Sequence, residues 1–186
     1  MRPRSVAGPG PPLTLPPAGA EPYTPGMGML TPLAIKIGAL AWVPTLLPQI
    51  TWLDKLIQRL TGGRLSILRI AGLPNLMLTV VGRKSGIPRS TPLLCVPYRD
   101  GNLIAGSNFG GQKAPVWVVN VRAAAAAGQT VTVDVQGHVH QAVPREISGA
   151  ERDQVWQHML RTWPNYAKYA ERTDRLIPVF LLEPAA

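Results

Sequence analysis

The residues best suited to do chemistry are three neighbouring cations. Two lie on a short turn bounded by glycines, and the third lies just after it. Gly82-Arg83-Lys84-Ser85-Gly86 directly follows the apolar run 76–81, and Arg89 lies just beyond it. In a turn, side chains and backbone N–H groups can converge on one anion, and the planar fork of arginine suits phosphate and carboxylate. The first glycine of a Walker P-loop is missing. The turn is therefore predicted to bind an anion, although a plain basic hairpin would have a similar sequence.

The distribution of charge supports an anionic ligand. The chain of 186 residues has a formal net charge of +9. Residues 55–99 include no acidic residue but eight basic ones: Lys55, Arg59, Arg64, Arg69, Arg83, Lys84, Arg89 and Arg99. Such a block favours phosphate, polycarboxylate, nucleic acid or an anionic membrane surface. Nucleic acid is not expected as a partner, because the cations are not interleaved with aromatic residues and no reading motif occurs.

The amino-terminal third is predicted to lie outside the catalytic domain. Residues 1–28 are rich in proline and glycine and are predicted to be disordered. Residues 29–60 form an apolar to amphipathic, helical segment that is broken by prolines, so it suits contact with a membrane surface better than a span. The single cysteine, Cys95, has no partner in the chain and fits a reducing compartment. We expect a cytoplasmic protein in which residues 29–60 either contact the membrane peripherally or pack on the domain, and the basic block slightly favours the membrane.

Residues 61–186 are predicted to form one α+β domain built on a small β-barrel. Short β-patterns cover 76–81, 92–98, 103–105, 131–135, a run with Val139 and Val143, and 177–182. A helix is expected from Pro115 through the alanine run to Gly128. The capping-box pattern Ser148-x-x-Glu151 predicts the start of another. Mostly antiparallel strands with two or three helices point to a small barrel.

An ordered series of motifs resembles the family of deazaflavin (F420)-dependent nitroreductases and F420H(2)-dependent quinone reductases. The series is 78-Leu-Thr-x-x-Gly-Arg-Lys-Ser-Gly-x-Pro-Arg-89, Pro92-Leu93, Asp100-Gly101, Ser107, Gly110, Pro115-x-Trp117, Asn120, Tyr166, Tyr169, Thr173-Asp174-Arg175 and Ile177-Pro178. It spans about residues 60–184. The resemblance implies a split β-barrel, like those that bind FMN, which holds coenzyme F420 with its anionic phospholactyl and polyglutamate tail.

The resemblance also implies roles for individual residues. Coenzyme binding would involve Arg83, Lys84, Ser85, Arg89, Ser107, Asn108, Gly110, Pro115, Val116, Trp117 and Asn120. Tyr166 and Tyr169 would be the catalytic residues, lining the acceptor pocket and donating a proton or hydrogen bond to the reduced oxygen. Considered without the resemblance, the two tyrosines are equally well explained as packing residues. Trp117 could equally be buried against the barrel.

The expected activity is hydride transfer from reduced F420 to a small-molecule acceptor, either a quinone such as menaquinone or a nitroaromatic compound. Leu94 and Trp163 stand where nitroreductase-type members have tyrosines, Asn108 where they have lysine, and Phe109 where they have glycine, so the acceptor preference is open. His138 and His140 share a strand face without an evident third ligand, and no metal is expected. The alternatives are a split barrel that binds FMN or haem, and a non-enzymatic basic module at a membrane. The sequence does not predict the oligomeric state.

Overall fold

The computed structural model describes Lys36 and residues 73–185. Lys36 is helical and exposed, and the remaining predictions for residues 1–28 and 29–60 lie outside the described residues. The elements of the domain are, in chain order, β1 (Asn75–Val81), β2 (Pro88–Tyr98), β3 (Gly101–Ala105), the 3-10 turn η2 (Asn108–Gly110), α4 (Val116–Ala126), β4 (Val131–Val135), β5 (His138–Ile147), α5 (Gly149–Thr162), α6 (Asn165–Glu171) and β6 (Val179–Pro184).

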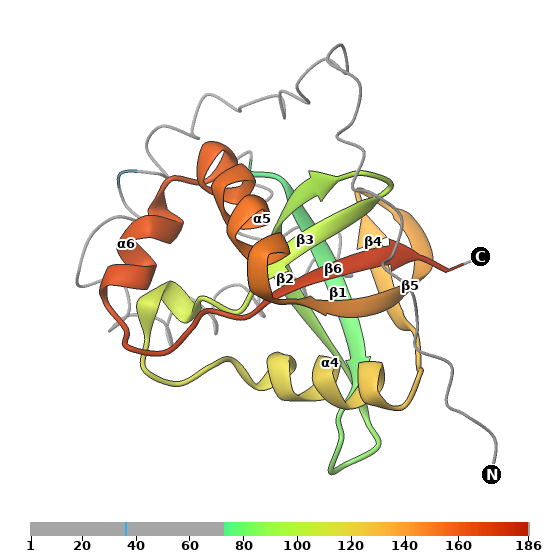
Figure 1. Cartoon of the computed structure of the whole chain (residues 1–186). Coiled ribbons are helices and arrows are strands. Elements are labelled where there is room, and N and C mark those ends of the chain that lie inside the picture. The colour runs from blue at the N-terminus through green and yellow to red at the C-terminus, as the bar shows by residue number, and fades with distance from the viewer. Residues whose placement is uncertain (1–35, 37–72, 186) are drawn as a thin grey trace, which may run out of the picture.

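The six strands close into an antiparallel barrel in the order β1-β2-β3-β6-β5-β4 (Figure 1). Two long strands each serve two neighbours. In β2 the first part pairs with β1, from Pro88 to Leu94, and the last part with β3. In β5 the first part pairs with β4 and the later part with β6. This arrangement explains why β2 tolerates Pro88 and Pro92, since a proline lacks the N–H that a second neighbour would need.

Alternation along the strands separates two apolar clusters. Ile104, Phe180 and Leu182 point into the barrel, where they pack with Leu78, Val133 and one face of α4. Their neighbours Leu103, Val179 and Leu181 point outward and pack with α5 and α6. Successive side chains of a strand alternate between faces, so β3 and β6 each supply residues to both clusters. Figure 1 shows the consequence: α4 lies below the barrel, and α5 and α6 lie together on another side.

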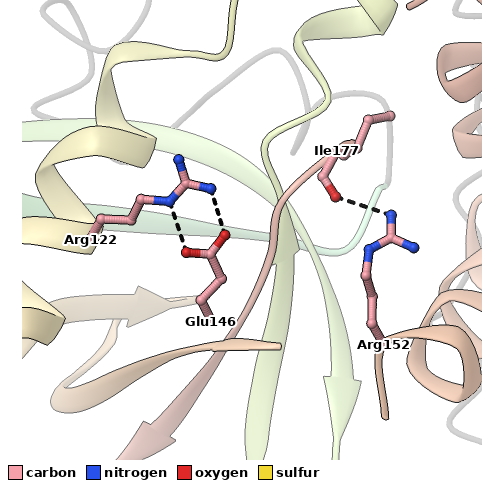
Figure 2. A network of polar contacts seen from close by, with 4 residues as sticks. All are labelled: Arg122, Glu146, Arg152 and Ile177. Carbon is pink, nitrogen blue, oxygen red and sulfur yellow. Dashed lines mark hydrogen bonds and ion pairs between the residues drawn. The ribbon is translucent and has the colours of Figure 1, made fainter. Parts of the chain in front are cut away.

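Ion pairs fasten two helices to β5. Arg122 on α4 donates from Nε and Nη2 to the two carboxylate oxygens of Glu146, over 2.8 and 2.6 Å (Figure 2). Arg145 makes a similar paired contact with Glu151 on α5, over 2.8 and 3.0 Å. Glu151 therefore serves an ion pair. The predicted capping box is wrong in this detail, because Ser148 makes no side-chain cap hydrogen bond although α5 does begin directly after it.

The expected α+β class is confirmed by the barrel and by three α-helices within residues 73–185. The helix predicted between Pro115 and Gly128 runs from Val116 to Ala126, and Gly128 has the expected positive φ, 64°. The last strand begins at Val179, two residues later than predicted. Within the described residues, no helix is long and apolar enough to cross a membrane.

Candidate coenzyme site

The basic turn, residues 82–87, joins β1 to β2 and carries its cations outward. Arg83, Lys84 and Arg89 are all exposed, and no ion pair between them and an acidic side chain occurs in the described part of the chain. The N–H of Gly82 donates to the carbonyl of Ile87 over 2.9 Å, and that of Gly86 to the carbonyl of Gly82 over 2.8 Å. A Cβ on Gly82 would lie 2.7 Å from Ser85 Oγ. These hydrogen bonds and close contacts give the turn a compact shape. Its cations remain exposed and are not neutralised by described acidic side chains.

One buried amide fixes this turn to α4. Asn120 is 5% exposed, and its Oδ1 accepts the backbone N–H of Arg83 over 3.2 Å. The two residues are 37 positions apart, so the bond sets the direction in which the turn leaves the barrel. Asn120 was predicted to contact the coenzyme, and its visible role is to hold the residue that carries the first cation of the turn.

The second predicted coenzyme segment is the 107–111 loop, which contains η2. Asn108, Phe109 and Gly110 are three successive residues with positive φ, at 48°, 53° and 85°. Left-handed backbone costs a residue with a side chain roughly 1–2 kcal/mol, so Asn108 and Phe109 together store about 2–4 kcal/mol. Gly110 is required for space as well, since a Cβ there would lie 2.7 Å from the Cβ of Arg172. Contacts within the loop and from other parts of the chain must offset this strain.

Local hydrogen bonds account for part of that compensation. The N–H groups of Gly110 and Gly111 donate to the carbonyls of Ser107 and Asn108 over 2.9 and 2.8 Å. The Asn108 side chain donates from Nδ2 to the carbonyl of Lys113 over 2.9 Å. Asn108, the position at which the resemblance to nitroreductase-type proteins leads one to expect a lysine, therefore shapes the following segment in this chain.

A distant arginine supplies further contacts. Arg175, in the segment between α6 and β6, donates from Nη2 to the carbonyl of Ser107 over 2.8 Å and from Nε to the carbonyl of Gly111 over 3.0 Å. One guanidinium therefore spans the first and last residues of the loop. Its Nη1 is buried and has no hydrogen-bond partner among the described residues, and burial lowers the pKa of Arg175 from its usual value. The sequence analysis gave this residue no role, because nothing in its local sequence indicates what it contacts.

The two predicted catalytic tyrosines lie on α6, in the outer apolar cluster. Each is 3% exposed, and their rings meet edge to face with centroids 6.1 Å apart. Burial raises the pKa of both phenols above the usual value, so both are neutral hydrogen-bond donors at physiological pH. For Tyr169 a hydrogen bond from the Trp163 indole works in the opposite direction.

Tyr169 is the tyrosine that adjoins the 107–111 loop. Its ring lies 5.6 Å from that of Phe109, centroid to centroid, whereas Tyr166 packs on Trp156 at the same separation. Leu94 and Trp163, the two positions that depart from tyrosine, belong to this apolar cluster. The structure thus brings the predicted acceptor-side residues together, against one end of the predicted coenzyme loop.

The remaining predicted residues occupy the start of α4. Pro115 precedes the helix, and Val116 is 72% exposed beside it. Trp117 is 7% exposed and packs inside the barrel, with its ring centroid 5.9 Å from that of Phe180. The indole ring therefore follows the alternative of burial against the barrel.

Other reactive side chains have structural environments. Cys95 is 3% exposed, and burial raises the pKa of its thiol to about 12, which leaves it inert at neutral pH. Among the described residues, no group of three or more His, Cys, Asp or Glu side chains could hold a metal ion.

Comparison with known proteins gives this geometry a context. A family model described as F420H(2)-dependent quinone reductase matches residues 53–184. An F420H(2)-dependent quinone reductase of Mycobacterium tuberculosis is 32% identical over 138 residues, covering 72% of this chain and 89% of that protein.

Two solved structures agree with it. One, described as an F420-H2 dependent reductase, has a TM-score of 0.53 and 37% identity, and covers 59% of this chain and 94% of its own. Another, described as a domain-swapped dimer, has a TM-score of 0.56 and 33% identity, and covers 72% of this chain and 98% of its own. The match to the family model over most of the barrel domain, together with this relative, confirms the expected resemblance: the chain belongs to the F420H(2)-dependent quinone reductase family and is an oxidoreductase of that class.

Proposed function

We propose that this protein binds reduced F420 between the basic turn and the 107–111 loop and transfers a hydride from it to a quinone. The observation that carries the proposal is the basic turn itself. Arg83, Lys84 and Arg89 are exposed, close in sequence and not neutralised by acidic partners among the described residues. A coenzyme with a phosphate and a polyglutamate tail requires such a surface.

The residues present fit the coenzyme in charge. Three cations on one turn exceed the needs of a single phosphate, which favours the longer anionic tail of F420 over FMN. Gly82 and Gly110 each occupy positions where a Cβ would lie 2.7 Å from another atom of the protein, so each glycine lets its segment keep the close packing that fixes its shape. The N-terminus of α4 follows the 107–111 loop in the chain, since the helix begins at Val116, and it would add a favourable dipole for anions.

The chain's own contribution to the reaction would be binding, orientation and one proton. Bound F420 supplies the redox chemistry, because its reduced deazaflavin gives up two electrons as a hydride. A quinone that takes this hydride needs one proton to become the quinol, and oxidised F420 is the other product. Tyr169 is the favoured donor of a hydrogen bond or proton to the quinone oxygen, since burial keeps its phenol protonated. Tyr166, which is equally buried, would shape the wall behind it.

The acceptor side favours a quinone over a nitroaromatic compound. Leu94 and Trp163 replace two hydroxyl-bearing residues by apolar surface within one cluster, and an apolar wall suits a lipophilic quinone ring. Menaquinone is the natural candidate if residues 29–60 contact a membrane from the cytoplasmic side. Nitroaromatic reduction is the second candidate, supported only by the resemblance.

A paired titration tests the proposal. Purified protein is titrated with oxidised F420 and, in the same buffer, with FMN, following coenzyme fluorescence. We expect saturable binding of F420 and weaker or no binding of FMN, followed by reduction of menaquinone by reduced F420. Binding of FMN alone, or of haem, would move the protein to another class of split-barrel cofactor. Binding only to anionic vesicles, with a steep dependence on salt, would indicate a non-enzymatic membrane module.

A further inference from the structure

The 107–111 loop holds an unfavourable backbone and is braced from far along the chain. Two of its residues with side chains, Asn108 and Phe109, have positive φ. Arg175 contacts both ends of the loop, through the carbonyls of Ser107 and Gly111, which lie 68 and 64 positions away in sequence. Since both contacts come from one planar group, the distance and angle between the loop's two ends are set together.

The contacts of Arg175 do not resemble those of an arginine placed for stability alone. Its acceptors are two neutral carbonyls, and Arg175 makes no ion pair with any carboxylate of the described residues. Nη1 is buried without a partner, which is costly for a charged group. Stability alone would favour an apolar or fully paired side chain at this position. What the guanidinium achieves is a fixed loop geometry, and that loop carries three of the predicted coenzyme residues, Ser107, Asn108 and Gly110.

A second arginine provides an internal comparison. Arg152 on α5 is also partly buried, with a side chain 14% exposed and an Nε that lacks a hydrogen-bond partner. It donates from Nη2 to the carbonyl of Ile177 over 3.2 Å, as Figure 2 shows. Arg152 thus holds the same α6–β6 segment that carries Arg175, but none of its described hydrogen bonds reaches the 107–111 loop. A comparison of Arg152 with Arg175 therefore distinguishes loss of support for the α6–β6 segment from loss of support for the 107–111 loop.

We propose that Arg175 is a positioning residue for the coenzyme: its guanidinium holds the 107–111 loop in the conformation in which Ser107 and Asn108 meet the bound F420. This inference rests on the proposed function. It assigns no contact between Arg175 and the coenzyme. The residue acts through the loop backbone, so it affects coenzyme affinity and loop opening more than it affects the chemical step.

The test compares three variants with the wild type, each first checked for a folded barrel by its thermal unfolding. Arg175→Met removes the fork and the charge, Arg175→Lys keeps the charge but can reach only one carbonyl, and Arg152→Met removes the comparable brace of the neighbouring segment. Two quantities are measured well below the midpoint of unfolding. They are the Kd for oxidised F420 by fluorescence, and the hydrogen exchange of the peptide covering residues 107–113 without coenzyme.

Both Arg175 variants are expected to raise the Kd by about 10-fold and to speed exchange in the loop peptide. Arg152→Met should lower the unfolding temperature while leaving Kd and loop exchange within about twofold of wild type. Wild-type affinity in Arg175→Lys would overturn the inference, because charge alone would then suffice. An equal loss in Arg152→Met would also overturn it, since general destabilisation would explain both. If the wild type itself failed to bind F420, the proposed function would fail and the inference with it. Wild-type binding that the Arg175 variants retain would refute the inference alone.

Discussion

Replacing Lys84 by alanine separates coenzyme binding from folding. Lys84 is exposed at the middle of the basic turn, and its side chain makes no ion pair with any described residue. Its removal should change the free energy of unfolding by less than about 0.5 kcal/mol, as for surface positions without specific contacts. A charge-assisted hydrogen bond contributes about 1.5–3 kcal/mol, and solvent screening at this exposed turn lowers that to about 1–2 kcal/mol. The Kd for F420 should then rise about 5- to 30-fold.

The control is Arg161→Ala, which removes one positive charge from an exposed position on α5. Both variants lower the net charge equally, so long-range attraction of the anionic coenzyme is matched. Fluorescence titration at low and high salt gives the Kd, and urea denaturation gives the stability. The difference between the two variants should shrink at high salt, because an exposed ionic contact is screened. Equal Kd values for Lys84→Ala and Arg161→Ala, or unfolding of Lys84→Ala, would refute a direct role of the turn in tail binding.

Three further outcomes follow from the structure. Gly110→Ala should cost at least about 2 kcal/mol of stability and weaken F420 binding, since φ is 85° and a Cβ would lie 2.7 Å from that of Arg172. The control is Gly128→Ala, where φ is 64° and an added Cβ would meet nothing within 4 Å. It should cost only about 1 kcal/mol in the same denaturation assay. Tyr169→Phe should lower kcat for quinone reduction about 100-fold with an unchanged Kd for F420, and an unchanged kcat would exclude the phenol as donor. Burial raises the pKa of the Cys95 thiol from 9.0 to about 12. Between those pH values only the unfolded chain releases this proton, so the free energy of unfolding falls by about 1.4 kcal/mol per pH unit. The difference in the free energy of unfolding between wild type and Cys95→Ala should therefore narrow between pH 8 and about pH 10, and a constant difference would contradict the burial of the thiol.

The sequence was informative where local rules decide the conformation. Alternating apolar residues predicted the strands, and glycines marked the ends of the basic turn and of α4. The capping-box prediction failed because Glu151 found a better partner, the Arg145 guanidinium on the adjacent strand. Ile177 was assigned to the last strand from its apolar character, but pairing begins only at Val179, beyond Pro178. A proline cannot donate to a strand ladder, which explains the later start.

The geometry of the candidate site was not predictable in the same way. Neither asparagine nor phenylalanine marks a left-handed turn strongly enough to predict the conformation of residues 108–110. That conformation depends on Arg175 and on the space beside Arg172, both more than sixty positions away. The partner of Asn120 was likewise hidden, since its amide serves the backbone of Arg83. Long-range polar contacts of this kind leave no periodic signal in the sequence.

These contacts bear on the proposed coenzyme site, in which two separate surface segments would hold one ligand. Both segments are short. The basic turn is exposed to solvent, and the 107–111 loop has an unfavourable backbone conformation, so each needs contacts with the rest of the domain to keep its shape. Asn120 fixes the first to α4, and Arg175 fixes the second to the segment entering β6. Asn120 lies on α4 next to Val121, and Arg175 lies in the segment that leads into β6, which contains Phe180. Val121 and Phe180 are both fully buried. Single polar side chains therefore attach both segments to the packed barrel. Binding of an extended anionic ligand would then not incur the free-energy cost of ordering these two segments.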